Sequence, residues 1–299
     1  MTVRYEHEPR LRRPALVAAF QGWNDAGDAA TDALRWLARR FEARAFAAFD
    51  IEEYLDFQAA RPTVELVDGV LRMVEWPSLT FSAAAAGRDL VLLLGVEPNL
   101  RWRSFSEDVV SVARRTGCEM IVTLGALLGD APHSRPVRCT GSATDEVLAA
   151  RLGMQRSRYE GPTGIVGVLH DSVRRAGFAS ASIWAPVPHY VASPPNPKAT
   201  HALLDKLAAL LDLDLDLTDL EIAAAAWERS VSEVVRADGD VSAYVANLEA
   251  RYDAAAASLV DEDDDEEDDE DDWLDEDDLP SGESLAADFE RYLRDRRDD

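Results

Sequence analysis

Short apolar runs alternate with helical patterns over the first two thirds of the chain. The runs are rich in β-prone residues, and between them apolar residues recur every three or four positions, as on one face of a helix. This order is typical of an α/β protein in which a mostly parallel sheet is covered by helices. The pattern predicts strands at 15–20, 45–49, 63–67, 70–76, 89–95, 119–124 and 178–185, and helices at 29–41, 101–116, 145–151 and 165–176.

The dipeptide Asp68-Gly69 separates two of these strands. Asp-Gly suits the two-residue turn of a β-hairpin, because both of its residues tolerate a positive φ. We therefore expect part of the sheet to be antiparallel.

From Asn196 onward the pattern is helical. Asn196 is expected to cap a helix that has Pro197 at its first position. The sequence Thr218-Asp-Leu-Glu221 is a capping-box pattern before a second helix, and a turn at 237–240 separates that helix from a third. The alternating segment 211–217 is interpreted as a connector rather than a strand. The last two helices are predicted to form a hairpin packed on the sheet domain.

Acidic residues are concentrated near the C-terminus. The segment 261–278 holds 16 Asp or Glu and no basic residue, in a chain whose net charge is −26. Such a charge density forbids a hydrophobic core, so a disordered linker is expected there. Apolar residues return at helical spacing beyond it and could bind a partner: Leu285, Phe289, Tyr292 and Leu293. The predicted segments are an N-terminal arm (1–14), an α/β core domain (15–215), a helical hairpin (216–259), a disordered acidic linker (260–280) and a short amphipathic helix (281–299).

Composition restricts the possible partners and the compartment. Residues 1–260 hold 35 acidic against 27 basic residues and carry no basic stripe, so neither nucleic acid nor an anionic membrane surface is expected as a partner. No apolar run approaches the length of about 18 residues that spans a bilayer. Only Cys118 and Cys139 are present, which does not suggest a disulfide framework. We expect a cytoplasmic protein.

Three stretches carry a resemblance to a known family. The sequence Phe20-Gln-Gly-Trp-Asn-Asp-Ala-Gly-Asp-Ala-Ala30 contains the glycine-tryptophan-x-aspartate-alanine-glycine signature of the proteasome assembly chaperone family, second-chaperone type, and resembles its actinobacterial members. The stretches 125–136 and 184–198 agree with the same family, in the same order. The resemblance covers about residues 15–255.

The resemblance implies a three-layer α/β/α core similar to that of the purine nucleoside phosphorylases, a C-terminal helical part and a tendency to form homo-oligomers. Relatives in eukaryotes and archaea assist or bind the proteasome core particle, so the resemblance also implies protein partners, among them proteasome components. Archaeal relatives that dock on the core particle end in a hydrophobic residue, a tyrosine and one final residue. This chain ends in Arg297-Asp-Asp299, which departs from that pattern.

One candidate crevice lies where open α/β sheets often bind ligands, at the carboxyl edge of the strands. Trp23, Asn24, Asp25 and Asp28 follow the first buried strand. The structural interpretation is that Asp28 caps the next helix and Trp23 packs over the sheet edge. We favour it, because aspartates without a basic partner repel a phosphate.

Asp130, His133 and His189 lie in loops that could meet at the same edge. A hydrolase would add a nucleophile such as Ser134, Ser193 or Cys139, but no nucleophile-elbow motif surrounds them. A metal site is not predicted, because the spacing of these residues is loose. Proline-flanked histidines are more often loop residues bonded to backbone.

The glycine-rich segment 161–167 precedes a helix but is neither the dinucleotide fingerprint nor a P-loop. Gly164 and Gly167 are interpreted as sites of close helix-to-sheet packing, and His170 as a surface or core residue.

Two functional hypotheses follow. The leading one is a protein-binding oligomeric scaffold or assembly chaperone, with no cofactor, no metal and no assigned catalytic residue. The alternative is a small-molecule-binding protein or enzyme whose site lies at the carboxyl edge. An enclosed cavity with convergent polar groups would favour the alternative, and an edge filled by side chains would favour the scaffold.

Overall fold

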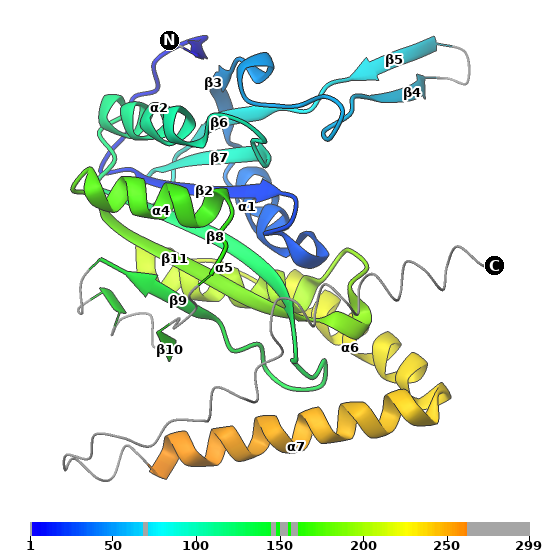
Figure 1. The fold of residues 1–299 in the computed structure, drawn as a ribbon. Helices are drawn as coiled ribbons and strands as arrows, with labels where there is room; N and C mark the ends of the chain where they lie inside the picture. Colours follow the sequence, from blue (N-terminus) through cyan, green and yellow to red (C-terminus); the bar gives the residue numbers. More distant parts are fainter. Residues whose placement is uncertain (1, 68–70, 145–147, 150–154, 157–160, 262–299) are drawn as a thin grey trace. The chain divides into compact units, whose positions relative to one another are not determined.

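A nine-stranded mixed sheet forms the centre of the molecule in the computed structural model (Figure 1). The structure describes residues 2–67, 71–144, 148–149, 155–156 and 161–261. The strand order is β1-β3-β6-β7-β2-β8-β11-β9-β10. The strands are β1 (Val3–Tyr5), β2 (Ala15–Gln21), β3 (Arg44–Phe49), β6 (Leu79–Ala84), β7 (Leu90–Val96), β8 (Met120–Gly129), β9 (Thr140–Ala143), β10 (Gln155–Arg156) and β11 (Ala179–Pro188).

The centre of the sheet is parallel and its flanks are largely antiparallel. Strands β7, β2, β8 and β11 run in the same direction, whereas β1, β3 and β6 on one side and β9 on the other pair antiparallel with their inner neighbours. The parallel strands read as continuous apolar runs because helices cover both of their faces. The carboxyl ends of β2, β7 and β8 therefore meet at one edge.

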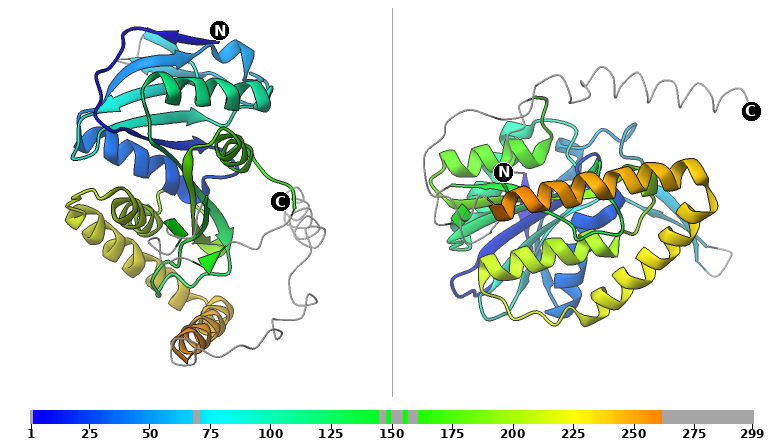
Figure 2. Two further views of the ribbon diagram at one scale, coloured as in Figure 1. Left: turned by 90° about the vertical axis from the view of Figure 1, so that its left-hand side faces the viewer. Right: turned by 90° about the horizontal axis from the view of Figure 1, so that it is seen from below.

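Helices cover the sheet on both faces, which confirms the predicted three layers. Helices α2 (Trp102–Arg115) and α4 (Ile165–Arg175) lie on one face, and α1 (Ala29–Arg40) and α5 (Pro197–Leu211) lie on the other (Figure 2). Each pair buries its apolar stripe in a separate hydrophobic cluster. Alternate residues of β2 serve the two clusters, Ala15 and Val17 facing α1 and Leu16 and Phe20 facing α2.

The predicted hairpin exists but does not join the main sheet. Strands β4 (Thr63–Val67) and β5 (Leu71–Glu75) pair antiparallel as a separate two-stranded sheet that extends away from the main sheet (Figure 1). The antiparallel part of the main sheet comes instead from β1, β3, β6 and β9. Strands β1, β6, β9 and β10 were not predicted, and β8 and β11 extend several residues beyond their predicted ends.

Two more helices follow α5 through the connector 212–217, which is irregular as predicted. Helix α6 (Thr218–Ala237) packs against α5, and α7 (Gly239–Asp261) follows after a short turn. Val231, Val235 and Val245 form a small hydrophobic cluster near that turn. Both predicted helices are thus present, and they share apolar contacts near the turn rather than along their length.

The two predicted caps of these helices differ in outcome. Asn196 Oδ1 accepts a hydrogen bond from the Ala199 backbone N–H at 2.9 Å, which confirms the cap of α5. The capping box at Thr218 is wrong, because Thr218 is already inside α6 and donates its backbone N–H and its hydroxyl to Asp216 Oδ1.

Residues 1–253 form one structural unit and residues 254–299 a second, of which the structure describes the end of α7. The predicted linker and terminal helix, with Leu285, Phe289, Tyr292 and Leu293, lie outside the described residues. Of the predicted helix at 145–151, only residues 148 and 149 are described, and both are helical. No helix in the described part of the chain is both long enough and apolar enough to span a membrane.

Candidate functional site

The turn between β2 and α1 places Asp25, not Asp28, at the start of the helix. Asp25 Oδ1 accepts the backbone N–H groups of Ala30 at 2.8 Å and Thr31 at 3.1 Å, and Asp25 Oδ2 accepts the Thr31 hydroxyl at 2.5 Å. Asp28 has a left-handed backbone with φ of 54° and makes no side-chain cap bond. The prediction that Asp28 caps this helix is therefore wrong.

Gly27 makes this turn possible. Its φ is +60°, and a Cβ built on it would lie 2.9 Å from the Cβ of Asn196. The Asn196 backbone N–H donates to the Gly27 carbonyl at 2.9 Å. A side chain at this position would be strained by its backbone and would separate the β2–α1 turn from the start of α5.

Asn24 and Asp25 are buried, with 0 % and 4 % of their surface exposed. Burial raises the pKa of the Asp25 carboxyl, while its bonds to Thr31 and Ala30 oppose that shift. The carbonyl of Asn24 accepts the Ala126 backbone N–H at 2.9 Å, which attaches the turn to β8. The side chain of Asp25 and the backbone of Asn24 thus stabilise the junction of β2, α1 and β8.

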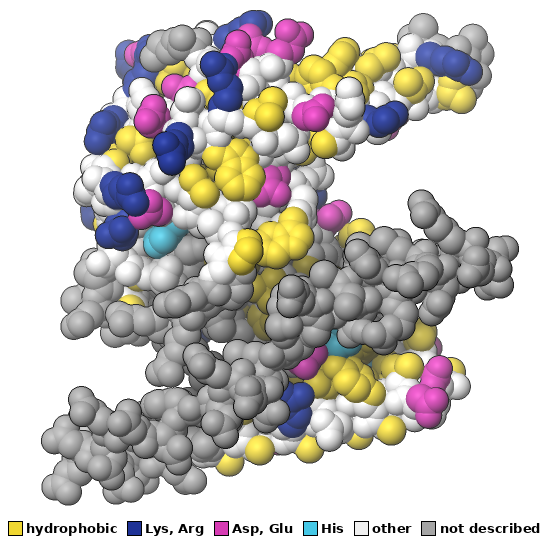
Figure 3. Space-filling view, in the orientation of Figure 1, with side chains coloured by type: hydrophobic (Ala, Val, Ile, Leu, Met, Phe, Trp, Pro, Cys, Tyr) yellow, Lys and Arg dark blue, Asp and Glu magenta, His cyan; other side chains and the backbone are white. Residues whose placement is uncertain are grey.

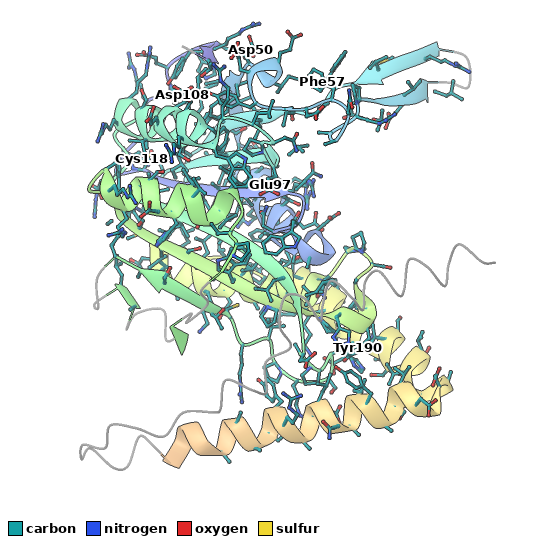
Figure 4. The ribbon with its side chains drawn as sticks, viewed as in Figure 1. Asp50, Phe57, Glu97, Asp108, Cys118 and Tyr190 are labelled. Atoms are coloured by element: carbon teal, nitrogen blue, oxygen red, sulfur yellow. The ribbon has the colours of Figure 1, made fainter. Side chains whose placement is uncertain are left out.

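Trp23 is 72 % exposed, so the expectation that it packs over the sheet edge is wrong. Glu97 follows β7 (Figure 4), and its carboxylate accepts the backbone N–H of Ile165, the first residue of α4, at 3.0 Å. A Cβ on Gly164 would lie 2.9 Å from Glu97 Oε1. The predicted helix-to-sheet role of Gly164 is therefore wrong: the glycine makes room for a carboxylate that occupies the N-terminus of α4, where an anion would otherwise bind.

Gly167 also differs from its prediction, because a Cβ there would meet the side chain of Thr163 rather than the sheet. His170 is half-buried on α4, and its Nε2 lies 3.3 Å from the Ser142 hydroxyl.

The structure brings Asp130, His133 and His189 together around Tyr190. The rings of both histidines lie edge-on to Tyr190, at centroid distances of 5.9 Å for His133 and 5.7 Å for His189. His189 Nδ1 lies 3.4 Å from Asp130 Oδ1. Tyr244 of α7 donates its hydroxyl to Asp130 at 3.2 Å and stacks edge-on against His189 and Tyr190. Figure 4 shows Tyr190 beside α6 and α7.

His133 is buried with both ring nitrogens bonded. The Tyr190 oxygen lies 2.8 Å from the His133 backbone N and 2.9 Å from Nδ1, and Ser232 Oγ of α6 lies 3.0 Å from Nε2. We assign the ring hydrogen to Nε2, because the Tyr190 hydroxyl then donates to Nδ1 and Nε2–H donates to Ser232. Burial lowers the pKa of His133, which favours this neutral form.

Two of the three nucleophiles that the sequence offered, Ser134 and Cys139, do not complete a hydrolase arrangement. Ser134 donates its hydroxyl to Glu249 of α7 rather than to a histidine. Cys139 is buried, and burial raises the pKa of its thiol to about 12, so the reactive thiolate is disfavoured. Within the described ranges, no group of three His, Cys, Asp or Glu side chains is arranged to hold a metal ion.

The candidate crevice therefore consists of two separate groups. One surrounds the β2–α1 turn with Trp23, Asn24 and Asp25, and the other surrounds Tyr190. Sequence reasoning missed Glu97, Tyr190, Ser232 and Tyr244, which complete these groups. Tyr190 directly follows the predicted His189, but Ser232 and Tyr244 come from α6 and α7, and no local pattern connects them to the loops.

The family model of the PAC2 family matches residues 19–235. The chain belongs to the PAC2 family. A PAC2 family protein from Streptomyces avermitilis is 48 % identical, with a TM-score of 0.72 over 78 % of this chain and 99 % of the other. The proteasome-assembly chaperone homologue Rv2125 of Mycobacterium tuberculosis is 46 % identical, with a TM-score of 0.72 over 77 % and 99 %.

Rv2714 of Mycobacterium tuberculosis, a protein of unknown function, is 29 % identical, with a TM-score of 0.81 over 88 % of this chain and 92 % of the other. No curated protein matches the chain. The suspected relationship to actinobacterial members of the family is thus confirmed.

Proposed function

We propose that this PAC2 family protein is a protein-binding oligomeric scaffold that serves as an assembly chaperone connected with the proteasome. A relative that is 46 % identical over nearly its whole length is described as a proteasome-assembly chaperone homologue. The observation that carries the proposal on this chain is the apolar face of the ribbon formed by β4 and β5.

The register of this ribbon places most of its exposed large apolar side chains on one face. Val64 pairs with Val74 and Leu66 with Arg72, and side chains directly opposite each other lie on the same face. That face carries Val64, Leu66, Arg72 and Val74, and Trp76 continues it. The opposite face carries Thr63, Glu65, Met73 and Glu75. Alternation of this kind is typical of a sheet with one buried face.

The apolar face of the ribbon is nevertheless exposed. Its four large apolar side chains are between 52 % and 61 % exposed, and hydrophobic side chains lie open along the extension (Figure 3). Trp76 contacts Phe57 near the base of the ribbon, with ring centroids 5.1 Å apart. An isolated two-stranded ribbon is marginally stable in water, and exposed apolar patches mark protein-binding surfaces. This face therefore fits a protein partner. A second copy of the chain is one such partner.

The carboxyl edge of the sheet supports the same function. The polar side chains around Tyr190 bond to one another and to α6 and α7, and the N-terminus of α4 is occupied by Glu97. These groups are engaged in contacts within the chain, as expected for an edge filled by side chains rather than an open catalytic crevice.

The oligomerisation part of the proposal is tested by paired substitutions on the two faces of the ribbon. Val64→Lys with Val74→Lys places two charges on the apolar face. Thr63→Lys with Met73→Lys places two charges on the opposite face and serves as the control. We expect the first pair to dissociate the oligomer while the control pair leaves it intact, as measured by light scattering, with unchanged circular dichroism for both.

The proteasome part is tested by cross-linking the protein in its own cells and identifying the linked peptides by mass spectrometry. We expect peptides of core-particle subunits among them, and faster assembly when the protein is added to purified core-particle subunits. If the protein forms oligomers but gives neither result, the scaffold function stands and the connection with the proteasome is excluded.

A further inference from the structure

Three pairs of arginines lie at the amino edge of the parallel strands, opposite to the candidate crevice. Strands β2, β8 and β11 begin at the same level, because Ala15 and Ala179 both pair with Met120. Helices α2 and α4 end shortly before β8 and β11, so their last turns meet at this edge. Lys and Arg side chains gather there, at the left of Figure 3. We call the six arginines the basic patch: Arg12, Arg13, Arg114, Arg115, Arg174 and Arg175.

Contacts between elements make the patch continuous. Arg114 Nη2 donates to the Ala176 carbonyl at 3.3 Å, which joins the end of α2 to the end of α4. Arg115 Nε donates to Glu8 Oε1 at 2.9 Å, which joins the end of α2 to the N-terminal segment. The three pairs are far apart along the chain, so the sequence shows no basic stripe even though the fold assembles one surface.

Positive charge is in excess within the patch. Asp171 is shared by the two arginines of α4. Glu119 is shared by Arg13 and Arg88. The helix dipole takes up only part of the excess, since the negative end of a helix amounts to about half a charge. Counting Arg88, seven guanidinium groups face four carboxylates among the described residues: Glu8, Asp89, Glu119 and Asp171.

The ion pairs of the patch are open to solvent. Arg114 bonds to no carboxylate in the described part of the chain. Exposed ion pairs contribute little to stability, because water and salt screen them. Carboxylates of another molecule can therefore bind these guanidinium groups at small cost. Five of the side chains are between 42 % and 82 % exposed: Arg12, Arg13, Arg115, Arg174 and Arg175.

A strongly acidic polypeptide has the charge that complements this patch, and the sequence itself contains one. Residues 261–278, the acidic run, hold 16 Asp or Glu and no basic residue, in a chain whose net charge is −26. Copies of such a chain repel each other. That repulsion decreases if the run of one copy lies against the patch of another. The same net charge disfavours nucleic acid, because the chain as a whole repels phosphates.

We propose that the basic patch binds the acidic run of a second copy of this chain. The guanidinium groups donate paired hydrogen bonds to the carboxylates of the run, a geometry that suits arginine. The binding is electrostatic, so it weakens as the salt concentration rises. The contact uses neither β4 nor β5, so it does not depend on the interface proposed for the ribbon.

The first test uses the full-length chain with its own run neutralised, so that this run does not compete. In this neutral-run chain the 16 acidic residues of 261–278 are replaced by Asn and Gln. Val64→Lys with Val74→Lys is added, so that the ribbon contributes no contact. The probe is a fluorescent peptide of sequence 261–278, and the comparison is the same peptide with Asn and Gln. We expect fluorescence anisotropy to show binding of the acidic peptide alone, with an affinity that falls at least tenfold between about 0.05 M and about 0.5 M sodium chloride.

Paired substitutions assign the binding to the patch. Arg114→Gln with Arg175→Gln removes one charge from each helix and should weaken binding of the peptide about tenfold or more. Arg229→Gln with Arg236→Gln removes two exposed arginines of α6 and is the matched control, which should bind as before. Circular dichroism verifies that both pairs fold. If the first pair does not fold, Arg12→Gln takes its place and should weaken binding roughly threefold.

The second test asks whether the occupant is the run of a second copy. The neutral-run chain is labelled and titrated with a full-length chain that keeps its acidic run but carries Arg114→Gln with Arg175→Gln. Both chains carry the two ribbon substitutions, so failure of the ribbon interface and failure of this contact are distinguishable. We expect the anisotropy to rise with this partner. It should not rise when the run of the partner is also neutralised.

Each remaining outcome overturns the proposal. If the acidic peptide does not bind at the lower salt concentration, the patch has no affinity for the run. If the patch and control variants bind the peptide equally, the run binds elsewhere. If single-stranded RNA or phosphatidylserine vesicles bind more tightly than the peptide, the class of ligand is wrong. If the peptide binds and the second chain does not, the occupant is not a second copy.

Discussion

Asp25 and Asp28 lie in the same turn, and their backbone conformations give them different roles. Asp25 accepts two backbone N–H groups at the start of α1, whereas Asp28 has a left-handed φ and no cap bond. We therefore expect Asp25→Ala to lower the free energy of unfolding by about 1–2 kcal/mol. Asp28→Ala should change it by less than about 0.5 kcal/mol. Urea denaturation of both variants measures the difference, and equal losses would show that the cap is misassigned.

His133 provides a prediction about pH. Burial places its folded-state pKa below the ordinary value of 6.5. Between that lowered pKa and 6.5, the unfolded chain binds more protons than the folded chain, so stability rises with pH through this window and is lost as the pH falls through it. The free energy of unfolding should accordingly decrease below pH 6.5.

In His133→Gln, this decrease should be smaller, as measured by urea denaturation between pH 5 and 8. It should not vanish, because burial also lowers the pKa of His170. Above pH 7.5, where both imidazoles are neutral, the slopes of the two proteins should coincide. An unchanged slope below pH 6.5 would mean that His133 is not neutral and buried in solution.

At the scale of elements, α7 is attached to the β8–β9 loop mainly by polar contacts. Arg135 donates to both carboxylate oxygens of Asp253, at 2.8 Å and 2.7 Å, and lies 3.6 Å from Glu249. The guanidinium of Arg138 stacks on the ring of Tyr252 at 3.7 Å. Among the side chains of α7 up to residue 257, the buried apolar ones are Val245 and Leu248, in the first half of the helix.

This attachment should be sensitive to Arg135 and to salt. We expect Arg135→Gln to raise amide hydrogen exchange in residues 246–253 roughly two- to fivefold, because partly exposed ion pairs contribute modestly. Sodium chloride at 0.5 M should do the same to the unmodified chain, since it screens the pairs. Arg174→Gln, which removes the pair with Asp171 on α4, is the matched control and should leave this segment unchanged. If residues 246–253 exchanged equally fast in Arg135→Gln, in the unmodified chain at 0.5 M sodium chloride and in Arg174→Gln, apolar contacts rather than ion pairs would hold α7.

At the scale of the whole molecule, the N-terminal segment is part of the fold. Val3 is buried in strand β1, which pairs with β3, and the hydroxyl of Thr2 lies 2.8 Å from that of Tyr54. We expect a chain ending at Asp261 to melt within about 2 °C of the full protein, because the described core residues all precede it. Removing residues 1–14 as well should cost about 2 kcal/mol, on the order of one buried valine. Calorimetry measures the melting temperatures of the chain that ends at Asp261 and of the same chain without residues 1–14. Equal melting temperatures would contradict the prediction.

The sequence by itself determined the class of fold and the order of its parallel strands and covering helices. Continuous apolar runs fix strands that are covered on both faces, and stripes at helical spacing fix α1, α2, α4 and α5, because each pattern has one low-energy way to bury its apolar side. Local chemistry also sufficed for the cap at Asn196, since cap and helix are adjacent in the chain. Three motifs in the expected order were likewise enough to identify the family.

Only the tertiary structure decided where these elements place their side chains. The cap of α1 depends on a backbone angle at Asp28, which the sequence does not reveal. The ribbon of β4 and β5 has the pattern of a buried sheet and yet stands apart, because its partner is not set by local pattern. The contacts of His133 with Ser232, and of Lys198 with Glu228, join residues 99 and 30 positions apart. Such contacts form because packing brings α6 onto the β8–β9 loop and α5. The periodicity of the sequence does not show which elements will pack against each other.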